Sequence, residues 1–389
     1  MVVFLRQEAE RLIDLLRPDR LEDGRPRYVR SGRYRRTLVT KFGKILFEVG
    51  RVYDRLRRRT LTPILLALGL RRRRYSLDLR LACAEEATRT TYGEASESIH
   101  RTLSLWVPRR TIWNFVKELA PWVEAGLRNV PLRETEGCHA ADGTFVRAVR
   151  RGTQHEVNVA VRQRSYDHKV ELVAVQVDGP ARGVLDPRGV EHLVTDDAPA
   201  YTDELARWHQ LCQVHFLRHV RSLLTDERGL MTIPERETVL RELGGVLGHL
   251  RASVEKHRTD GDKVAITYRT EATLRRLGDI GGELERRGLR QTARYVRERG
   301  RATVVFAEVA GHGGWMPATS NGVERMMGII ADRCKRKWAH WNSGLENLLR
   351  LLLVRKTRPA AYAWATRRYL GGGSMEHRPL RGGPVVNKS

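Results

Sequence analysis

Three strand-like stretches in the middle of the chain constrain its fold more than any other feature. They run from Cys138 to Val149, from Glu156 to Val161 and from Val170 to Val177, and apolar residues, Val above all, dominate them. Because short connections separate them, an antiparallel meander is the simplest arrangement. Helical periodicity is typical of much of the remaining chain, so the sequence predicts an α/β protein built around this sheet.

An acidic residue interrupts the first of these strands. Asp142 lies inside the stretch Cys138–Val149, where aspartate is disfavoured, and Gly143 follows it. A bulge or turn at this Asp-Gly pair is one explanation. The other is that function requires a carboxylate at this point of the sheet.

Two more acids end a further apolar run. A Gly- and Pro-rich link, residues 179–189, leads to the run His192–Thr195, which is followed by Asp196 and Asp197. Carboxylates at the carboxyl end of a strand lie where ligands bind in open α/β sheets. We expect Asp196 to be the functional acid because it directly ends the run, with Asp197 as the alternative. Residues 201–208 then predict a helix.

A third acid stands in the first turn of a predicted helix, Ser320–Trp341. Asn321 and Glu324 fit the N-cap and N3 positions of a helix start. Glu324 either completes this cap or presents a carboxylate to a cleft, because it falls at the border of the apolar stripe. At helical spacing that stripe comprises Val323, Met327, Ile330, Cys334, Trp338 and Trp341.

The charge of the chain indicates a polyanionic partner. Lys and Arg number 71 against 46 Asp and Glu, which gives a formal net charge of +25. Double-stranded DNA is the expected partner, because neutralising phosphates releases condensed counterions, and an anionic membrane surface is the rival. With no apolar run of membrane-spanning length and a charged opening segment, we expect a cytoplasmic, nucleoid-associated protein.

The first 130 residues are the expected DNA-binding region. Residues 1–75 predict a basic amphipathic helix and a small β unit, and residues 76–130 predict short helices broken near Gly93 and Pro108. Such breaks favour a helix-turn-helix, whose later helix places its N-terminal residues at base edges. In a helix-turn-helix, the residues facing DNA are Arg109, Arg110 and Asn114. The alternative is a plain helical bundle with solvated arginines.

Asp142, Asp196 and Glu324 together indicate phosphoryl transfer. Three hard oxygen donors can hold two Mg²⁺ or Mn²⁺ ions, whose coordination is completed by water and substrate phosphate. Two metals about 4 Å apart clamp the attacking and leaving oxygens of an in-line displacement. The cysteines are far apart and lack Cys-x-x-Cys spacing, so they predict free thiols. They are Cys83, Cys138, Cys212 and Cys334.

At these residues the chain resembles the DDE transposases of bacterial insertion sequences, particularly the mutator-like group and related families with an Asp-Gly-Thr first acid. The resemblance covers most of the chain. Its motifs are Ala141–Thr144, Val194–Asp196 with Cys212 and His215 downstream, and Thr319–Glu324. The link 179–189 departs from the family, whose core usually has a full helix there.

The resemblance implies a ribonuclease-H-like catalytic core, residues 131–216 and 319–370, with an all-helical insertion at 217–318. It also implies that Asp142, Asp196 and Glu324 are the catalytic metal ligands. Cys212 and His215 carry over as a structural marker. The tail, residues 371–389, is rich in Gly and Pro and predicts disorder.

The expected function is a transposase that binds the ends of its insertion sequence, cleaves DNA there and joins the 3′ hydroxyl ends to target DNA. Two ends require two active sites, so we expect a homodimer or larger assembly on DNA. A catalytically lost DNA-binding regulator and a ribonuclease-H-like nuclease without strand transfer are the alternatives.

Four further residues are candidates for contacts with DNA. Three of them, Arg333, Lys335 and Arg336, are basic residues that follow Glu324. If the chain binds DNA through this helix, they contact phosphate; in the alternative, they are simply solvated. Trp315, in a loop before the Glu324 helix, either stacks on an unpaired base or anchors the helical insertion.

Overall fold

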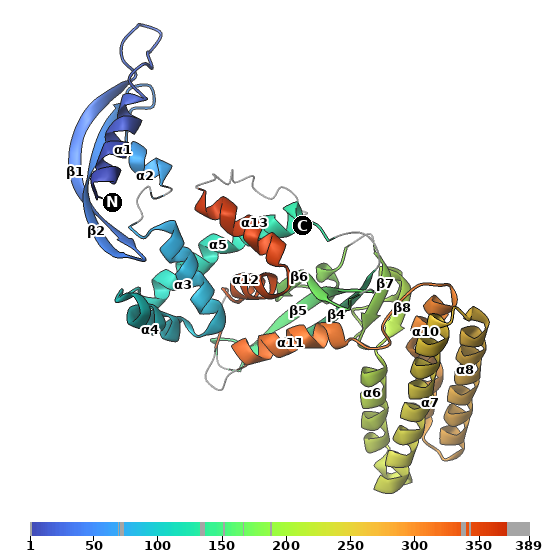
Figure 1. Cartoon of the computed structure of the whole chain (residues 1–389). Helices are drawn as coiled ribbons and strands as arrows, with labels where there is room; N and C mark the ends of the chain where they lie inside the picture. Colours follow the sequence, from blue (N-terminus) through green and yellow to red (C-terminus); the bar gives the residue numbers. More distant parts are fainter. Residues whose placement is uncertain are drawn as a thin grey trace, which may run out of the picture. The chain divides into compact units, whose positions relative to one another are not determined.

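The computed structural model of the protein describes residues 2–68, 70, 74–132, 137–150, 152–165, 167–186, 189–335, 340–341 and 344–371 (Figure 1). The chain forms two compact units, Met1–Val130 with Ala360–Ser389, and Pro131–Pro359. No helix within the described residues is both long and apolar enough to cross a membrane.

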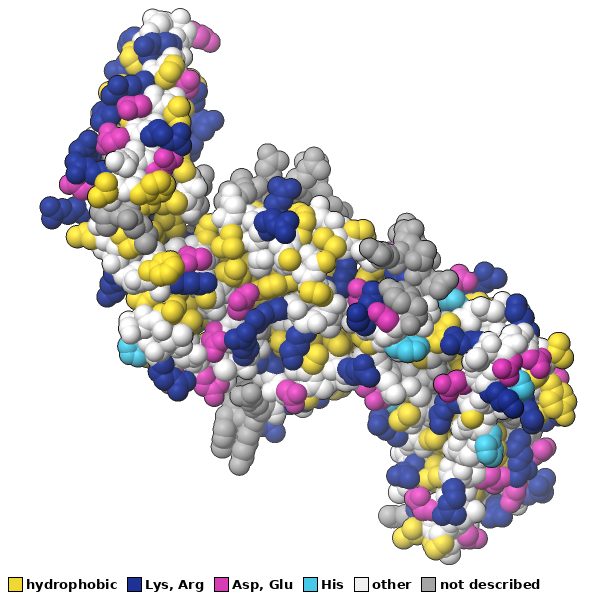
Figure 2. Space-filling model, in the orientation of Figure 1, with side chains coloured by type: hydrophobic (Ala, Val, Ile, Leu, Met, Phe, Trp, Pro, Cys, Tyr) yellow, Lys and Arg dark blue, Asp and Glu magenta, His cyan; other side chains and the backbone are white. Residues whose placement is uncertain are grey.

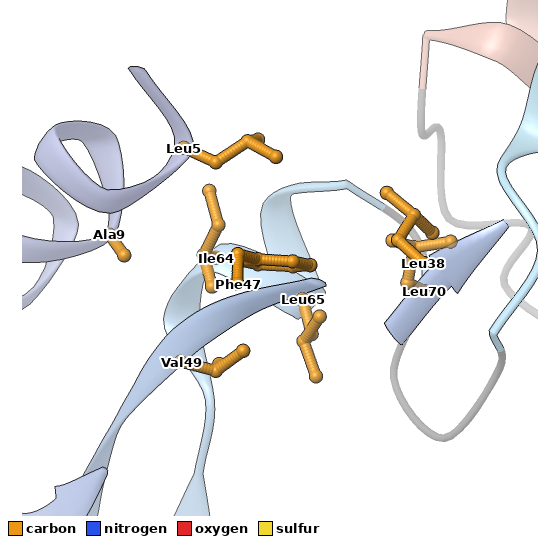
Figure 3. Close-up of a cluster of buried hydrophobic side chains, with 8 residues drawn as sticks. All are labelled: Leu5, Ala9, Leu38, Phe47, Val49, Ile64, Leu65 and Leu70. Atoms are coloured by element: carbon orange, nitrogen blue, oxygen red, sulfur yellow. The ribbon is translucent and has the colours of Figure 1, made fainter. Parts of the chain in front are cut away.

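The first unit begins with a small antiparallel sheet and two short helices, where the sequence predicted a small β unit and one helix. The sheet has the order β1-β2-β3. Its elements are α1 (Val2–Asp14), β1 (Tyr28–Thr40), β2 (Gly43–Asp54), β3 (Arg59–Leu61) and α2 (Pro63–Ala67). The core between them consists of buried side chains from both helices, both long strands and the segment after α2 (Figure 3), namely Leu5, Ala9, Leu38, Phe47, Val49, Ile64, Leu65 and Leu70.

Helices form most of the remaining described part of the first unit. They are α3 (Leu77–Arg89), α4 (Tyr92–Leu103), α5 (Arg109–Asn129) and α13 (Pro359–Leu370). A capping box between Thr91 and Glu94 starts α4, and Pro108 is the N-cap of α5. The predicted breaks near Gly93 and Pro108 therefore coincide with real helix ends.

The last helix lies in a different unit from the one expected. The sequence assigned residues 319–370 to the catalytic core, but α13 belongs to the first unit from Ala360 onward. The reason is a close approach between helices, since a Cβ at Gly126 would lie 2.5 Å from the carbonyl oxygen of Ala361. Only glycine allows α13 to pack this closely on α5.

The second unit contains a mixed five-stranded sheet with the order β6-β5-β4-β7-β8. The three predicted strands form its antiparallel part. On the other side of β4, β7 pairs with β4 in parallel and β8 pairs with β7 in parallel. The α/β prediction is thus confirmed. The strands are β4 (Gly137–Arg147), β5 (Gln154–Arg164), β6 (Val170–Val177), β7 (Val190–Thr195) and β8 (Ala206–Leu211).

The connections around β7 differ from ordinary crossovers. Within the described residues of the link, 179–186 and 189, the one helical element is a short 3-10 helix, η1 (Ala181–Val184), whose Val184 packs on Ala141 and Ala160 of the sheet. The helix predicted at 201–208 is wrong. That segment forms the 3-10 turn η2 (Asp203–Leu205) and then β8, because pairing with β7 satisfies its backbone.

A group of helices lies between the last strand of the sheet and the helix that carries Glu324, as predicted for residues 217–318. Figure 1 shows α6, α7 and α8 as long rods extending from the sheet. Leu243 and Leu247 of α7 and Leu277 of α8 are among the buried side chains. The helices are α6 (Gln213–Asp226), α7 (Ile233–Thr259), α8 (Lys263–Arg286), α9 (Arg290–Gly300) and α10 (Val305–Gly311).

Two helices return to the sheet, α11 (Asn321–Cys334) on β4 and β5, and α12 (Leu345–Thr357) on β6. The helix carrying Glu324 is shorter than the predicted Ser320–Trp341. Its N-cap is Ser320, which makes no side-chain capping bond, so the capping role predicted for Asn321 and Glu324 is wrong. Trp341 lies beside β4, where its N–H donates to Arg147 O at 3.0 Å.

Candidate functional site

Asp142 and Asp196 are neighbours because of the register between β4 and β7. These strands are parallel, and Ala140 is paired with Val194. Asp142 lies two residues beyond Ala140, and Asp196 lies two residues beyond Val194. The register therefore places Asp142 of β4 level with Asp196, the first residue beyond β7.

The environment of Asp142 favours its protonated form. Burial, followed by the negative charge of Asp196, raises the pKa of Asp142 to about 6. The charge of Glu324 acts in the same direction, so all three predicted acids interact electrostatically. A hydrogen bond of 2.7 Å from the N–H of Gly143 to Asp142 Oδ1 opposes the shift in part.

Helix α11 covers the face of the sheet to which Asp142 points. Lys335 at its C-terminal end donates to Thr144 Oγ1 at 2.5 Å, and Thr144 has the same parity along β4 as Asp142. Glu324 in its first turn is half-buried. The Oε1 atom of Glu324 is buried and has no hydrogen-bond partner among the described residues, which is costly for a carboxylate oxygen.

The adjacent Asp197 has a different role from Asp196. Its Oδ1 accepts a hydrogen bond from Arg299 of α9 in an ion pair, and burial, together with the negative charge of Asp197, raises the pKa of Tyr295 on the same helix. Asp196 instead accepts a bond of 3.2 Å from the N–H of Ala198. The ion pair engages Asp197 with the helical insertion and leaves Asp196 as the acid beside Asp142.

Gly143 is part of a regular strand, so the bulge considered for Asp142-Gly143 is wrong. Pairing of β4 with β5 continues without a register shift from Gly137 to Arg147. A Cβ at Gly143 would lie 2.8 Å from Oδ1 of its partner Asn158. Asn158 is fixed by bonds from its Nδ2 to Glu156 Oε1 and Gly179 O, at 3.2 and 3.1 Å. Glycine is therefore required by the buried amide opposite.

Cys212 and His215 lie at the site and connect its elements. The N–H of Cys212 donates to Thr195 O at 2.8 Å, and the N–H of Ser320 donates to Cys212 Sγ at 3.3 Å. Burial would raise the pKa of Cys212, but hydrogen bonds with His215 and Ser320 lower it to about 7. The hydrogen bond to Cys212 raises the pKa of His215, and the charges of Asp142 and Asp196 add to this effect.

Tyr201 is a site residue that the sequence did not reveal. Burial raises its pKa, as do the negative charges of Asp196 and Asp142. Its hydroxyl is buried and has no hydrogen-bond partner within the described part of the chain. The proximity of Tyr201 and His215 to the acids depends on the path of the chain after β7, which no local pattern indicates.

The three acids suit hard divalent cations as donors. Among the described residues no group of three or more His, Cys, Asp or Glu side chains is arranged so that it could hold a metal ion. Mg²⁺, however, is usually bound by one or two carboxylates together with water and phosphate. Asp142 and Asp196 offer such a pair, and the unsatisfied Oε1 of Glu324 lies nearby. The donor set therefore fits Mg²⁺ or Mn²⁺.

The predicted DNA-contacting residues have very different surroundings. Arg109, Arg110 and Asn114 are exposed in the first turns of α5, and Arg110 stacks on Trp113 with its guanidinium carbon 4.0 Å from the ring centroid. Lys335 is exposed beside Thr144. Arg336 lies outside the described residues.

Arg333 is not on a basic surface as the sequence suggested. It is only 4 % exposed, and its guanidinium carbon lies 4.7 Å from the centroid of the Trp341 ring. In this position it supports the end of α11 rather than contacting phosphate. Trp315 is half-buried, with its ring 5.4 Å from that of His168 in the β5–β6 turn, so it packs beside the sheet.

Comparison with known proteins adds no family assignment, since no protein-family model matches the chain and no curated protein matches it.

Proposed function

We propose that this protein is a DNA transposase of the DDE type, which cleaves DNA strands by metal-dependent phosphoryl transfer and joins their 3′ ends to target DNA. The observation that carries the proposal is the pairing of Ala140 with Val194, which brings Asp142 beside Asp196. Two half-buried, mutually repelling carboxylates are a standard arrangement for a divalent-cation site.

The sheet supports a ribonuclease-H-like core. In chain order its strands are arranged 3-2-1-4-5, with an antiparallel meander first and two parallel strands after it. This is the arrangement that the resemblance to DDE transposases implies. A helical insertion, α6 to α10, lies between Asp196 and the helix of Glu324, as the resemblance also implies.

Each acid has a distinct part in the proposed reaction. Cations held by Asp142 and Asp196 would stabilise charge on the phosphoryl oxygens and lower the pKa of an attacking water. Glu324 Oε1, which has no partner among the described residues, accepts a proton or hydrogen bond from the attacking water or 3′ hydroxyl. Lys335, which donates to Thr144, provides a cation for the scissile phosphate.

The first unit is the proposed DNA-binding part. Its helices α4 and α5 form the candidate helix-turn-helix, with Arg109, Arg110 and Asn114 exposed on α5. Figure 2 shows Lys and Arg side chains spread over the visible face of the β1–β2 region. These charges and the net charge of +25 suit the phosphate backbone.

The proposal is tested with purified protein and a duplex carrying the inverted repeats that flank its gene. Wild-type protein should nick and join DNA only when Mg²⁺ or Mn²⁺ is present. Asp142→Asn and Glu324→Gln should bind the duplex with unchanged affinity but neither cut nor join it. Cutting by either variant refutes the assignment of the acids. Hydrolysis without joined products would identify a nuclease instead.

Assembly is tested on the same DNA. Two ends brought together require two sets of acids, so light scattering should give a complex with at least two protein chains. A complex with one chain that still joins both ends contradicts this part of the proposal.

One observation favours a second candidate, a DNA-binding regulator without catalysis. The three acids interact electrostatically, yet the described residues form no group of three metal-ligating side chains. The regulator would bind the same inverted repeats but leave them intact in Mn²⁺.

A further inference from the structure

A pocket on the first unit lies between the start of α3 and one side of α5. Its volume is about 750 Å³, within the range of small-ligand sites. Basic and aromatic side chains provide most of its wall, together with Thr111 and Pro121. They are Arg74, Tyr75, Arg80, Phe115, Lys117 and Trp122; Asn114 also lines the pocket, and Glu118 is the one acid among the residues that line it.

Arg80 is the most informative residue of this wall. Its side chain is fully buried, and its Nη1 donates to Glu118 Oε1 at 3.0 Å. Tyr369 of α13 donates to the same oxygen at 3.2 Å. The Nε and Nη2 atoms of Arg80 are buried and have no hydrogen-bond partner among the described residues.

The unpaired edge of Arg80 has the geometry that binds an oxyanion. Nε and Nη2 form the side of a guanidinium that donates two parallel bonds. Elsewhere in this protein Arg11 and Arg164 use that same edge, to Glu8 and Asp167. Burying a guanidinium whose Nε and Nη2 donors have no acceptor costs free energy, unless a ligand accepts both hydrogen bonds. The pocket is therefore suited to a phosphate or carboxylate group.

The remaining wall favours a flat, aromatic ligand attached to that anion. Tyr75 and Phe115 meet edge to face with ring centroids 5.4 Å apart, and Trp122 adds a third ring. Aromatic side chains provide stacking surfaces for any nucleobase. The carboxamide of Asn114 offers a donor and an acceptor side by side, the pair that matches adenine.

We infer that this pocket binds a nucleotide, with its phosphate at the Nε–Nη2 edge of Arg80 and its base against Tyr75, Phe115 and Trp122. The nucleotide comes either from an unpaired DNA strand or from the free pool. The inference extends the DNA-binding role in the proposed function, but it depends on residues of the first unit alone.

Calorimetric titration of the full-length protein in EDTA tests the inference, because without metal the acids of the second unit provide no phosphate site. The probe is dAMP, with deoxyadenosine and inorganic phosphate as controls that lack one half of it. We expect dAMP to bind at least about tenfold tighter than either control. Equal affinity for dAMP and deoxyadenosine overturns the inference.

Three variants localise the binding. Arg80→Lys keeps the charge but loses the two-bond edge, so affinity for dAMP should fall about tenfold or more. Asn114→Trp fills the pocket from an exposed position without altering the core, and should abolish binding. Arg101→Lys, on the exposed side of α4, is the matched control and should bind normally. Unchanged affinity in both Arg80→Lys and Asn114→Trp refutes the site.

Two further measurements separate the sources and the proposals. Tighter binding of a single-stranded trinucleotide than of dAMP assigns the pocket to an unpaired DNA strand, and weaker binding assigns it to free nucleotide. If the protein binds dAMP but does not cleave DNA, the nucleotide pocket is supported and the proposed transposase activity is contradicted. If it cleaves DNA but does not bind dAMP, the proposed activity is supported and the nucleotide pocket is contradicted.

Discussion

The backbone N–H of Ser320 donates to the Sγ of Cys212 at 3.3 Å. This contact joins the N-cap of α11 to the N-cap of α6, and Cys212 in turn donates to Thr195, the residue before Asp196. Cys212 therefore links the start of the Glu324 helix, through its thiol, to the end of β7 beside Asp196, through its backbone N–H.

Removal of this thiol should impair cleavage more than stability. We predict that Cys212→Ala destabilises the protein by about 1 to 3 kcal/mol, because it loses buried contacts and hydrogen bonds. DNA cleavage should fall at least about tenfold while DNA binding is unchanged. Cys83→Ala, a buried cysteine of the first unit, is the control for urea unfolding. Equal loss of cleavage in both variants would show that Cys212 has no positioning role.

Stability should depend on pH through Asp142. Its pKa is raised from 3.8 to about 6 in the folded protein, so the folded state binds more protons than the unfolded state between these values. Stability attributable to this group is thus greatest below pH 4 and is lost as the pH rises to 6. Asp142→Asn should stabilise the protein at pH 8 by roughly 1 to 3 kcal/mol, and by far less at pH 4.

Divalent cations should offset the loss of stability that ionised Asp142 causes at high pH. Mg²⁺ that binds the folded state alone raises its stability by mass action, and only ionised carboxylates bind it well. We predict that millimolar Mg²⁺ raises the melting temperature of wild-type protein at pH 8 and leaves that of Asp142→Asn nearly unchanged. A similar increase in both would place the bound metal elsewhere.

Substitutions at the two neighbouring aspartates, Asp196 and Asp197, should have very different effects on DNA cleavage. Asp196→Asn should abolish cleavage, because it removes the acid beside Asp142. Asp197→Asn breaks only the partly exposed ion pair with Arg299, which is worth about 1 kcal/mol or less. Its cleavage rate in the standard nicking assay should stay within about threefold of wild type. The opposite ranking would make Asp197 the second acid.

A methyl group at position 143 should disturb the site sterically. Gly143→Ala places its Cβ against Asn158, and overpacking of this kind costs about 1 to 3 kcal/mol. Adding Asn158→Ala removes the clashing amide, so the double variant should be more stable to urea than additivity of the two single variants requires. Strict additivity would show that the two residues do not interact.

Short sequence patterns predicted those helices and strands that are determined by their own residues rather than by tertiary contacts. The meander from β4 to β6 was predicted from three Val-rich runs joined by short connections, whereas the helical insertion was implied by the resemblance to DDE transposases. The helix predicted at 201–208 failed because pairing of β8 with β7 overrides a weak local preference. Helix α11 buries Met326 in place of Met327, because the contact with the sheet sets its rotation.

The acids themselves were visible in the sequence, whereas their surroundings were not. Asp142 and Asp196 each stood out at an unusual position in an apolar run. The roles of His215 and Tyr201 depend on how the chain returns after β7, and the pairing of Asp197 with Arg299 spans 102 residues. Such contacts are set by tertiary structure and leave no short-range signal.

Helix α13 has a consequence for the order in which the protein matures. The N-terminal unit requires residues from Ala360 onward, such as Tyr362, which donates to Glu85, and Tyr369, which donates to Glu118. Domains generally fold during synthesis from the N-terminus, but here the closing helix leaves the ribosome only after the whole second unit. A nascent chain therefore completes its first unit last, after the whole second unit with Asp142, Asp196 and Glu324 has been synthesised.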